Sequence, residues 1–322
     1  MRRSAAMGKW TSWWPIFAPW VRKDLKCWRL QKECNWLCER GLVVRIKVWG
    51  TRGTVAMASP TFTKYGGNTS CMAVESADGS LLILDGGTGL PGLGQSLMET
   101  DFGQGRGRAH LLVSHLHWDH IQGIPFFGPV LIAGNHITLY GAGSAGLTFD
   151  QAMRAQVDST YCPVPNFFDD AFGATVENRE IGAGDFNIGS VRVRVLQITH
   201  QRGHTCLGFR FEEEGVCLAY LPTIEYLDPG HRQQAVDLAR GADLLVHDAH
   251  YTEAEYERVR GLGHASDRDA VEVARRAEVG QLLFFHHHPD RDDEAIDTLV
   301  AAYGNLACRV AGAREGAEFL LS

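Results

Sequence analysis

The sequence predicts an α/β protein in which two β-sheets pack face to face and helices cover their outer surfaces. Two observations predict this class. Short apolar strands recur in both halves of the chain, and each half also carries helical segments of its own. Because strands and helices each bury one apolar face, two sheets flanked by helices satisfy both kinds of element.

The first half begins with a regular strand pattern at residues 43–50, where apolar and polar side chains alternate. Further along, the patterns predict strands at 71–75, 81–84 and 111–113, a glycine-rich turn at 85–87 and a short helix at 93–98. The second half predicts strands at 191–198, 207–211, 216–220, 244–246, 282–285 and 318–321, and helices at 232–240, 267–277 and 293–302. Residues 148–185 show no regular pattern and are expected to form a lid or pocket wall, with Tyr161, Phe167, Phe168 and Phe172 as apolar contacts, or part of the core.

Composition excludes several classes of protein. The chain has 322 residues, of which 45% are hydrophobic and 21% charged, so wholesale disorder is excluded. A formal net charge of −7 argues against a protein whose affinity comes from coating a phosphate backbone with basic side chains. Small or short polyanionic substrates remain compatible with this charge.

The eight cysteines show no disulfide-framework spacing, and we interpret them as reduced thiols of a cytoplasmic protein. No run of 18 apolar residues exists, so the sequence predicts no membrane span, and the early apolar stretch does not resemble a signal peptide.

Residues 1–42 differ from the rest and are predicted to be an extension, outside a single domain at 43–322. Six of the eight tryptophans and three cysteines (Cys27, Cys34 and Cys38) lie there without a clear period. The extension is interpreted as an irregular or partly helical tail, or as sequence upstream of the native start. An interfacial membrane anchor and a thiolate metal site are the alternatives.

The most informative segment is 114–120, which directly follows an apolar strand. It contains four metal-ligand side chains: His115, His117, Asp119 and His120. In an extended segment His115 and His117 point to the same side, while Asp119 and His120 follow a turn and can face a second ion. Imidazole and carboxylate ligands suit Zn²⁺, with Mn²⁺ and Fe²⁺ as alternatives.

Distant histidines stand where further ligands are expected. His200 and His286 each end an apolar strand, and strand ends deliver side chains to a site. Taken alone, each would be interpreted as a capped or solvated histidine; together with the 114–120 cluster they are predicted to be ligands. His287 is weaker, because alternation sends it to the opposite face, and His288 is weaker too.

These residues resemble the metallo-β-lactamase superfamily, specifically its phosphodiesterase and ribonuclease Z-like branch. The resemblance covers residues 43–322. Besides the 114–120 motif, it rests on the segments Trp49-Gly50-Thr51-Arg52-Gly53, Tyr65-Gly66-Gly67-Asn68-Thr69-Ser70, Leu84-Asp85-Gly86-Gly87-Thr88-Gly89, His247-Asp248-Ala249, Gly263-His264-Ala265-Ser266 and Phe285-His286-His287.

The resemblance implies a four-layer αββα sandwich with one or two divalent ions, Zn²⁺ first, at one edge of the two sheets. One ion would take His115, His117 and His200, and the other Asp119, His120 and His286. A hydroxide held by the ions would be the nucleophile, with Asp119 among the catalytic residues. The resemblance further implies that His264 is the general acid, that Asp248 orients it, and that Asp85 orients a ligating histidine. Without the resemblance, His264 would be a loop or capping histidine and Asp85 a turn residue.

One departure concerns the anion that bridges the two ions in the family. The segment at 220–225 aligns Thr223 with the bridging aspartate, so a neutral hydroxyl replaces a carboxylate. Two cations without that anion repel each other more strongly, and affinity for the second ion is expected to fall. Three outcomes are compatible with this departure. Glu225 or Asp228 replaces the bridging carboxylate, the site holds one ion or two ions weakly, or the chain has lost activity and keeps the fold for binding; we favour a weakened site that still binds metal.

The leading hypothesis is therefore a metal-dependent hydrolase of a small phosphodiester such as a cyclic nucleotide. A ribonuclease Z-like nuclease is less favoured, because no long basic arm is visible. Lactam or thioester hydrolysis stays open, since function depends on the site rather than the fold. A non-catalytic binding protein with a decayed site at Thr223 is the alternative outside the enzymes. A homodimer is the expected assembly.

Overall fold

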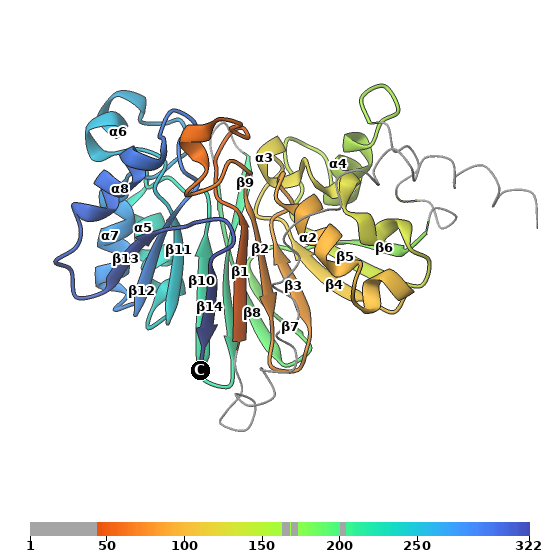
Figure 1. Cartoon of the computed structure of the whole chain (residues 1–322). Coiled ribbons are helices and arrows are strands. Elements are labelled where there is room, and N and C mark those ends of the chain that lie inside the picture. Colours follow the sequence, from red (N-terminus) through yellow and green to blue (C-terminus); the bar gives the residue numbers. More distant parts are fainter. Residues whose placement is uncertain (1–43, 163–167, 169–172, 200–203) are drawn as a thin grey trace, which may run out of the picture. The chain divides into compact units, whose positions relative to one another are not determined.

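The computed structural model describes residues 44–162, 168, 173–199 and 204–322 (Figure 1). They belong to one compact unit, Leu42–Ser322. The predicted extension at 1–42 lies outside the described residues. Within the described ranges, none of the helices combines the length and apolar character needed to cross a membrane.

The first sheet contains seven strands and is mixed. Its strands are antiparallel from β14 through β1 and β2 to β3 and parallel from β3 to β6. In spatial order they are β14 (Glu318–Leu321), β1 (Val44–Gly50), β2 (Cys71–Glu75), β3 (Leu81–Leu84), β4 (Arg108–Leu112), β5 (His136–Gly141) and β6 (Thr175–Glu180). In β1 the buried and half-buried side chains alternate, as the period of two predicts.

The second sheet also contains seven strands. Its strands are parallel from β13 to β10 and antiparallel from β10 to β7. In spatial order they are β13 (Arg309–Gly312), β12 (Gln281–Phe285), β11 (Leu244–Asp248), β10 (Val216–Leu221), β9 (Thr205–Glu213), β8 (Val191–Thr199) and β7 (Gly184–Ile188).

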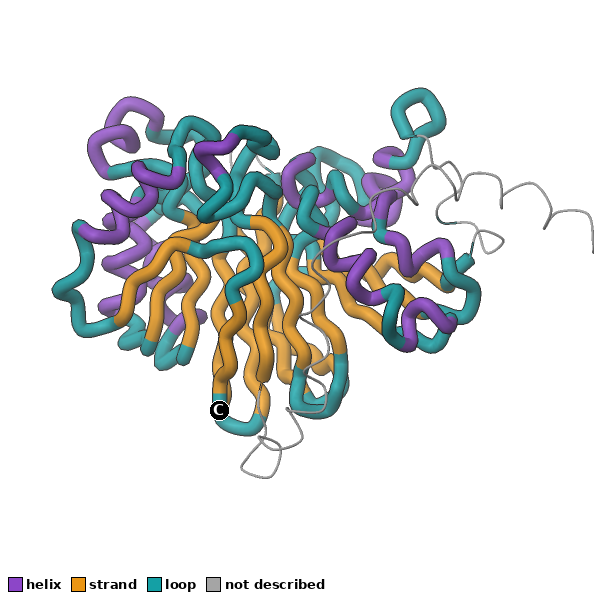
Figure 2. The backbone as a smooth tube through the Cα atoms, viewed as in Figure 1, coloured by secondary structure: helices purple, strands orange, loops and turns teal. Residues whose placement is uncertain are grey.

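The helices flank the strands on both sides (Figure 2). Their bounds are α2 (Leu90–Leu97), α3 (Trp118–Ile121), α4 (Phe149–Gln156), α5 (Pro229–Ala239), α6 (Glu253–Val259), α7 (Asp267–Arg276) and α8 (Asp293–Ala301), with short 3₁₀ turns η5 (Pro60–Phe62), η6 (Asp101–Gln104), η7 (Ile124–Phe126) and η8 (Gly128–Leu131). The start of α7 is fixed by a capping box between Ser266 and Asp269. The cap also fixes where the loop before α7 ends.

Three apolar clusters show the layers of the molecule. One joins the facing sides of the two sheets, where Ile46 and Val74 share a cluster with Phe209 and Val246. The outer side of the first sheet packs under α2 and α4, and the outer side of the second packs under α5, α7 and α8. The predicted αββα sandwich is therefore confirmed.

Four strands were not expected from the sequence, namely β5, β6, β7 and β13. β6 and β7 are edge strands with mostly exposed, polar side chains, so they carry little apolar alternation. The prediction that 148–185 is irregular was wrong, because this stretch holds α4, β6 and the start of β7. Tyr161 is 81% exposed rather than an apolar contact, whereas Phe168 packs against the core; Phe167 and Phe172 lie outside the described residues.

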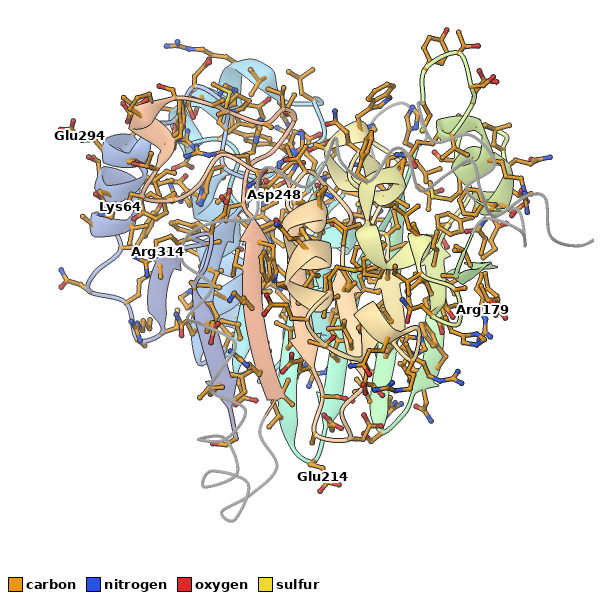
Figure 3. All side chains as sticks on the ribbon, turned by 45° about the vertical axis from the view of Figure 1, so that its right-hand side comes forward. Lys64, Arg179, Glu214, Asp248, Glu294 and Arg314 are labelled. Carbon is orange, nitrogen blue, oxygen red and sulfur yellow. The ribbon has the colours of Figure 1, made fainter. Side chains whose placement is uncertain are left out.

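The two sheets bring their functional segments to one end of the sandwich. The end of β11 and the segments that follow β3, β4, β10 and β12 meet there through hydrogen bonds made by their side chains, with other side chains or, for Asp248, with the amide of Ile224. Figure 3 shows Asp248, the last residue of β11, at this end and Glu214 at the opposite end. Such an edge is where sheets of this kind present ligand-binding groups.

Candidate metal centre

The 114–120 motif leaves β4 as a short extended segment and turns into α3. His117 is the N-cap residue of α3 and has extended backbone angles, so Asp119 and His120 lie in the first helical turn. His115, Asp119 and His120 are all buried. The motif therefore lines the interior of the site rather than the protein surface.

Asp119, His120 and His286 form a compact group of potential ligands. The Nε2 atoms of His120 and His286 are 3.1 Å apart, and Asp119 Oδ2 lies 2.9 Å from His286 Nε2 and 3.3 Å from His120 Nε2. Ligand atoms about 2.0–2.1 Å from a tetrahedral ion are about 3.3 Å apart, so these separations fit Zn²⁺. The structure thus brings together the three residues that the resemblance assigned to one ion.

Asp85 fixes the orientation of His120. Its Oδ2 lies 2.8 Å from His120 Nδ1 and accepts hydrogen bonds from the hydroxyls of Tyr220 at 2.8 Å and Ser114 at 2.9 Å. We assign one ring hydrogen of His120 to Nδ1, so that Nε2, which faces His286 and Asp119, is the nitrogen that a proton or a metal ion occupies. The resemblance implied that Asp85 orients a ligating histidine, and the contact with His120 is compatible with that prediction.

The charges of the site favour a cation at this position. Burial by itself would lower the pKa of His120, but the carboxylates of Asp119 and Asp85 outweigh it and raise the pKa to about 10. Burial would likewise raise the pKa of Asp119, yet the neighbouring His120 and His286 hold it far below its usual range. The same two carboxylates that stabilise a proton on His120 would therefore also stabilise a divalent ion at this position.

Three backbone positions in this site adopt the left-handed conformation without being glycine. Thr54, Asp85 and His286 have φ values of 67°, 60° and 58°. The amide of Thr54 donates to Asp119 Oδ2 at 2.7 Å. Strain of this kind collects where the chain must aim side chains at one point, and here it aims two carboxylates and an imidazole.

Gly53 packs directly against His286. A Cβ added at Gly53 would lie 2.2 Å from His286 Nδ1, so no larger residue fits without moving the imidazole. The glycine in the Trp49–Gly53 segment that carried the resemblance therefore has a steric role in the site.

Thr223 lies where the bridging anion was expected. It follows β10, is 2% exposed, and its Oγ1 is 3.4 Å from His120 Nε2. Its carbonyl oxygen accepts a hydrogen bond from the Cys206 thiol at 3.0 Å. A neutral hydroxyl therefore faces the ligands at the place where a carboxylate would neutralise bound cations.

Neither substitute carboxylate reaches the ligands. Both carboxylate oxygens of Glu225 accept backbone hydrogen bonds, from Gly261 at 2.6 Å and from Gly263 at 2.7 Å. Asp228 is exposed and caps α5 by accepting from the amide of Gly230. In this structure Glu225 holds the loop that precedes His264, and Asp228 holds a helix end.

His264 stands in this loop, paired with Asp248. His264 Nδ1 lies 3.0 Å from Asp248 Oδ2. The carboxylate is fully buried and also accepts from the amides of Ile224 and His250. Burial raises the pKa of Asp248 and lowers the pKa of His264. The pairing matches the predicted arrangement of a histidine oriented by a carboxylate.

The other half of the motif is less completely described. The rings of His115 and His117 lie 4.4 Å apart and those of His115 and His120 4.1 Å apart, so the three histidines are neighbours. Burial lowers the pKa of His117 to about 4, so its ring is neutral at neutral pH. His200, the predicted third ligand of this half, lies outside the described residues. His204 was not predicted, yet its ring lies 5.6 Å from that of His117.

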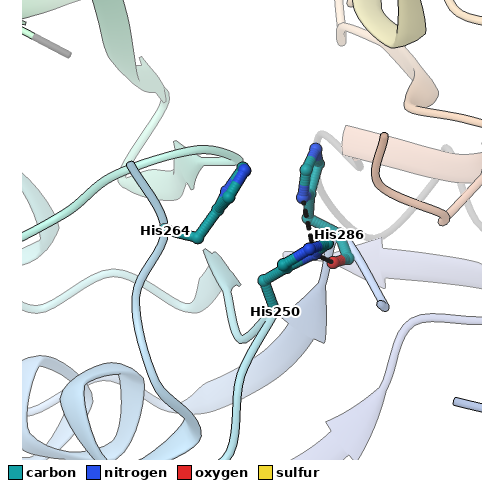
Figure 4. A group of neighbouring side chains, drawn as sticks. All are labelled: His250, His264 and His286. Atoms are coloured by element: carbon teal, nitrogen blue, oxygen red, sulfur yellow. Dashed lines mark hydrogen bonds between the residues drawn. The ribbon is translucent and has the colours of Figure 1, made fainter. Parts of the chain in front are cut away.

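Sequence reasoning also missed His250, which follows Asp248 by two residues. Together with His264 and His286 it forms a second group of potential ligands (Figure 4). Its Nδ1 lies 2.8 Å from the carbonyl oxygen of His286. The position of His250 two residues after Asp248 was the feature of the sequence that could have identified it. By contrast, His287 Nε2 donates to the carbonyl of Ala313 at 2.9 Å, and neither His287 nor His288 belongs to the two ligand groups found among the described residues.

Comparisons with known proteins identify the family of this chain. A family model described as "Beta-lactamase superfamily domain" matches residues 91–287, more than half of the chain. Ribonuclease BN of Citrobacter koseri is 26% identical over 259 residues, an alignment that covers 65% of this chain and 80% of that protein.

Two solved structures share the fold. The metallo-β-lactamase fold protein YhfI from Bacillus subtilis superposes with a TM-score of 0.62 at 18% identity, covering 86% of this chain and 99% of that one. The short form of human tRNase Z superposes with a TM-score of 0.58 at 19% identity, covering 85% of this chain and 98% of that one.

Proposed function

The chain belongs to the β-lactamase superfamily, and from this premise we propose that it is a metal-dependent hydrolase of small phosphodiesters. The observation that carries the proposal is the group of Asp119, His120 and His286, whose ligand atoms lie 2.9–3.3 Å apart. Three protein ligands plus an open position are typical of catalytic zinc sites. This group does not need a carboxylate at residue 223 to be complete.

The ion would be Zn²⁺, with Mn²⁺ or Fe²⁺ as alternatives, held by Asp119, His120 and His286. His115, His117 and His200 would supply a second position, weakened by Thr223. A divalent ion bound here would activate water and stabilise the charge that develops on the phosphoryl oxygens.

The chain's own residues orient the reaction. Asp85 keeps the hydrogen of His120 on Nδ1, so that Nε2 stays available as a ligand. Burial lowers the pKa of His264, so the resting ring is neutral, with its hydrogen on Nδ1 and bonded to Asp248. In the reaction the ring would take up a second proton on Nε2 from the attacking water and pass it to the departing oxygen, while the carboxylate of Asp248 stabilises the transient imidazolium. Glu225 keeps the loop that carries His264 in place.

Two substrates separate the roles of the ion and of His264. The phosphodiester bis(p-nitrophenyl) phosphate has a good leaving group that needs little protonation, whereas an alkyl phosphodiester needs a general acid. We expect chelation to abolish turnover of both substrates and added Zn²⁺ to restore it. We expect His264→Gln to lower kcat on the alkyl ester by about 100-fold or more, and to leave the nitrophenyl ester much less affected.

The control is His288→Gln, a neighbouring histidine without an assigned role. Equal losses on the two esters in His264→Gln would contradict the general-acid role. Turnover that survives complete removal of metal, verified by elemental analysis, would contradict the whole proposal. A protein that retains neither metal nor activity would instead be the decayed binding protein.

A second candidate, a ribonuclease, is favoured by the match to ribonuclease BN over 80% of that protein's length. The net charge of −7 favours the small substrate. Measuring kcat/KM on a cyclic nucleotide and on a short single-stranded RNA, at two salt concentrations, distinguishes them. We expect the cyclic nucleotide to be preferred with little salt dependence; a preference for RNA that falls steeply with salt would favour the nuclease. Size-exclusion chromatography with light scattering would check the expected homodimer.

A further inference from the structure

His250, His264 and His286 come from three separate segments and converge beside the Asp119 group. His250 follows β11, His264 precedes α7, and His286 follows β12 (Figure 4). Ring centroids lie 4.3 Å apart for His250 and His264, 4.8 Å for His264 and His286, and 5.1 Å for His250 and His286. One ligand nitrogen from each residue falls within 4.8 Å of the other two.

Two of these rings already have the partner that a metal-binding histidine needs. The Nδ1 hydrogen of His250 is donated to the carbonyl of His286 at 2.8 Å, and that of His264 to Asp248 at 3.0 Å. Both rings therefore keep a lone pair on Nε2. A histidine ligand almost always donates its other ring hydrogen to a carbonyl or carboxylate in this way.

From this arrangement we propose that His250, His264 and His286 form an alternative, nitrogen-only position for a divalent ion of the borderline class, such as Zn²⁺, Ni²⁺ or Cu²⁺. His286 belongs to both groups: its Nε2 lies 2.9 Å from Asp119 Oδ2 and its Nδ1 lies 3.3 Å from His250 Nδ1. Because a neutral imidazole has only one lone pair, the new position and the Asp119 position compete for this ring. Their ligands also differ in kind. The Asp119 group contains a carboxylate, which Mn²⁺ accepts, whereas three imidazoles favour Ni²⁺, Cu²⁺ and Zn²⁺.

Binding at the new position requires at most a modest closure. Tetrahedral Zn²⁺ brings nitrogen ligands to about 3.3 Å of each other, so nitrogens that lie within 4.8 Å of one another need to approach by no more than about 1.5 Å. The loop before His264 is suited to such a shift, since Gly261 and Gly263 both have φ of 92° and their amides donate to the same carboxylate, that of Glu225. The consequence for the proposed function is that an ion at this position takes His264 away from the leaving group.

The test measures metal binding directly, so it does not depend on turnover. Binding of Ni²⁺ and Mn²⁺ to the chelated full chain is measured by calorimetry and by the absorption of bound Ni²⁺. All proteins carry His117→Gln, which weakens the other histidine position of the motif. Four proteins are compared. One carries no further substitution, and the other three add His250→Gln, Asp119→Asn or, as the control, His288→Gln.

We expect His250→Gln to weaken Ni²⁺ binding by about tenfold or more while the affinity for Mn²⁺ changes by less than about twofold. We expect Asp119→Asn to do the reverse, and His288→Gln to change neither. Equal weakening of both ions by His250→Gln would overturn the proposal, because it would show that His250 only positions His286. Unchanged Ni²⁺ binding would overturn it as well.

The inhibitory consequence alone rests on the proposed function and has its own readout. In the otherwise unchanged chain we expect turnover per bound ion to be lower with Ni²⁺ than with Mn²⁺, and His250→Gln to reduce that difference. If no ion supports turnover, the proposed function fails while the two-ion binding data still decide the new position. If turnover is present and His250→Gln leaves the Ni²⁺ to Mn²⁺ ratio unchanged, the inhibitory consequence fails.

Discussion

The two groups of potential ligands share His286 and differ in charge. Asp119, His120 and His286 include an ionised carboxylate and have ligand atoms 2.9–3.3 Å apart, whereas His250, His264 and His286 offer three imidazoles and no carboxylate. The first group is fixed by neighbours that act before any ion arrives, namely Asp85 and the amide of Thr54. The difference teaches that a carboxylate determines which ion a site accepts, because Mn²⁺ prefers oxygen ligands and Ni²⁺ or Cu²⁺ prefers imidazole.

Removing the carboxylate of Asp119 is expected to have the largest effect on the difference between the two groups. Asp119→Asn keeps the shape of the side chain but removes its charge. We expect affinity for Zn²⁺ and Mn²⁺ at the first group to fall by about 100-fold or more. Elemental analysis and calorimetry measure this, with Asp290→Asn as the control, since Asp290 is exposed and binds neither group. Full metal content in Asp119→Asn would mean that the three-imidazole group holds the ion.

His287, the residue after the ligand His286, tests a second kind of buried histidine. The question is whether a buried neutral histidine outside the ligand groups accounts for the stability that the protein loses in acid. Burial lowers the pKa of His287 to about 3, below the value of about 6.5 expected in the unfolded chain. Its contribution is therefore complete above pH 6.5 and is lost as the pH falls toward 3. In the chelated protein, we expect His287→Gln to remove about 2–3 kcal/mol of the stability lost between pH 6.5 and 4.5. Urea unfolding at the two pH values measures this; an unchanged loss would show that His287 is not responsible.

Adding a carboxylate at residue 223 sharpens the difference. Thr223→Asp would place an anion close to His120 Nε2. We expect about tenfold tighter binding of the ions and, in the chelated protein, a lower Tm, because the new buried anion lies near Asp119. Zn²⁺ should restore the Tm. Thr223→Asn is the uncharged control, and equal metal binding by the two variants would show that charge at this position is unimportant.

The smallest expected effect comes from the loop that carries His264. Glu225→Gln keeps one acceptor for the amides of Gly261 and Gly263 but removes the charge. We expect kcat on the alkyl phosphodiester to fall by about tenfold or less, with metal content at the Asp119 group unchanged. Asp228→Asn is the matched control on the same segment. A loss of metal in Glu225→Gln would mean that Glu225 supports the ligands rather than the loop.

The ligands of the first group could be predicted because their signal is local. His115, His117, Asp119 and His120 follow one apolar strand within six residues, and His286 ends another. The roles of Glu225 and His250 could not be predicted, because their contacts are distant in the sequence. Glu225 accepts from amides 36 and 38 residues away, and His250 donates to a carbonyl 36 residues away. Such contacts depend on which strands are neighbours, and a single sequence does not state this.

The fold was predicted where burial imposes a pattern and missed where it does not. β1 and β10 are detected by their apolar side chains, whereas the edge strands β6 and β7 expose theirs. The polar side chains that suit an edge strand also remove the alternation that would identify it.

The carboxylates around the site have one further consequence, for the order of events in making the protein. Asp85, Asp119 and Glu225 each accept hydrogen bonds from backbone amides of this chain, so their charges are stabilised without any cation. Folding therefore does not have to wait for metal. The newly made chain can complete its sandwich first and take up its ion afterwards, from whatever supply it then meets, and the nature of that supply decides which of the two groups is filled.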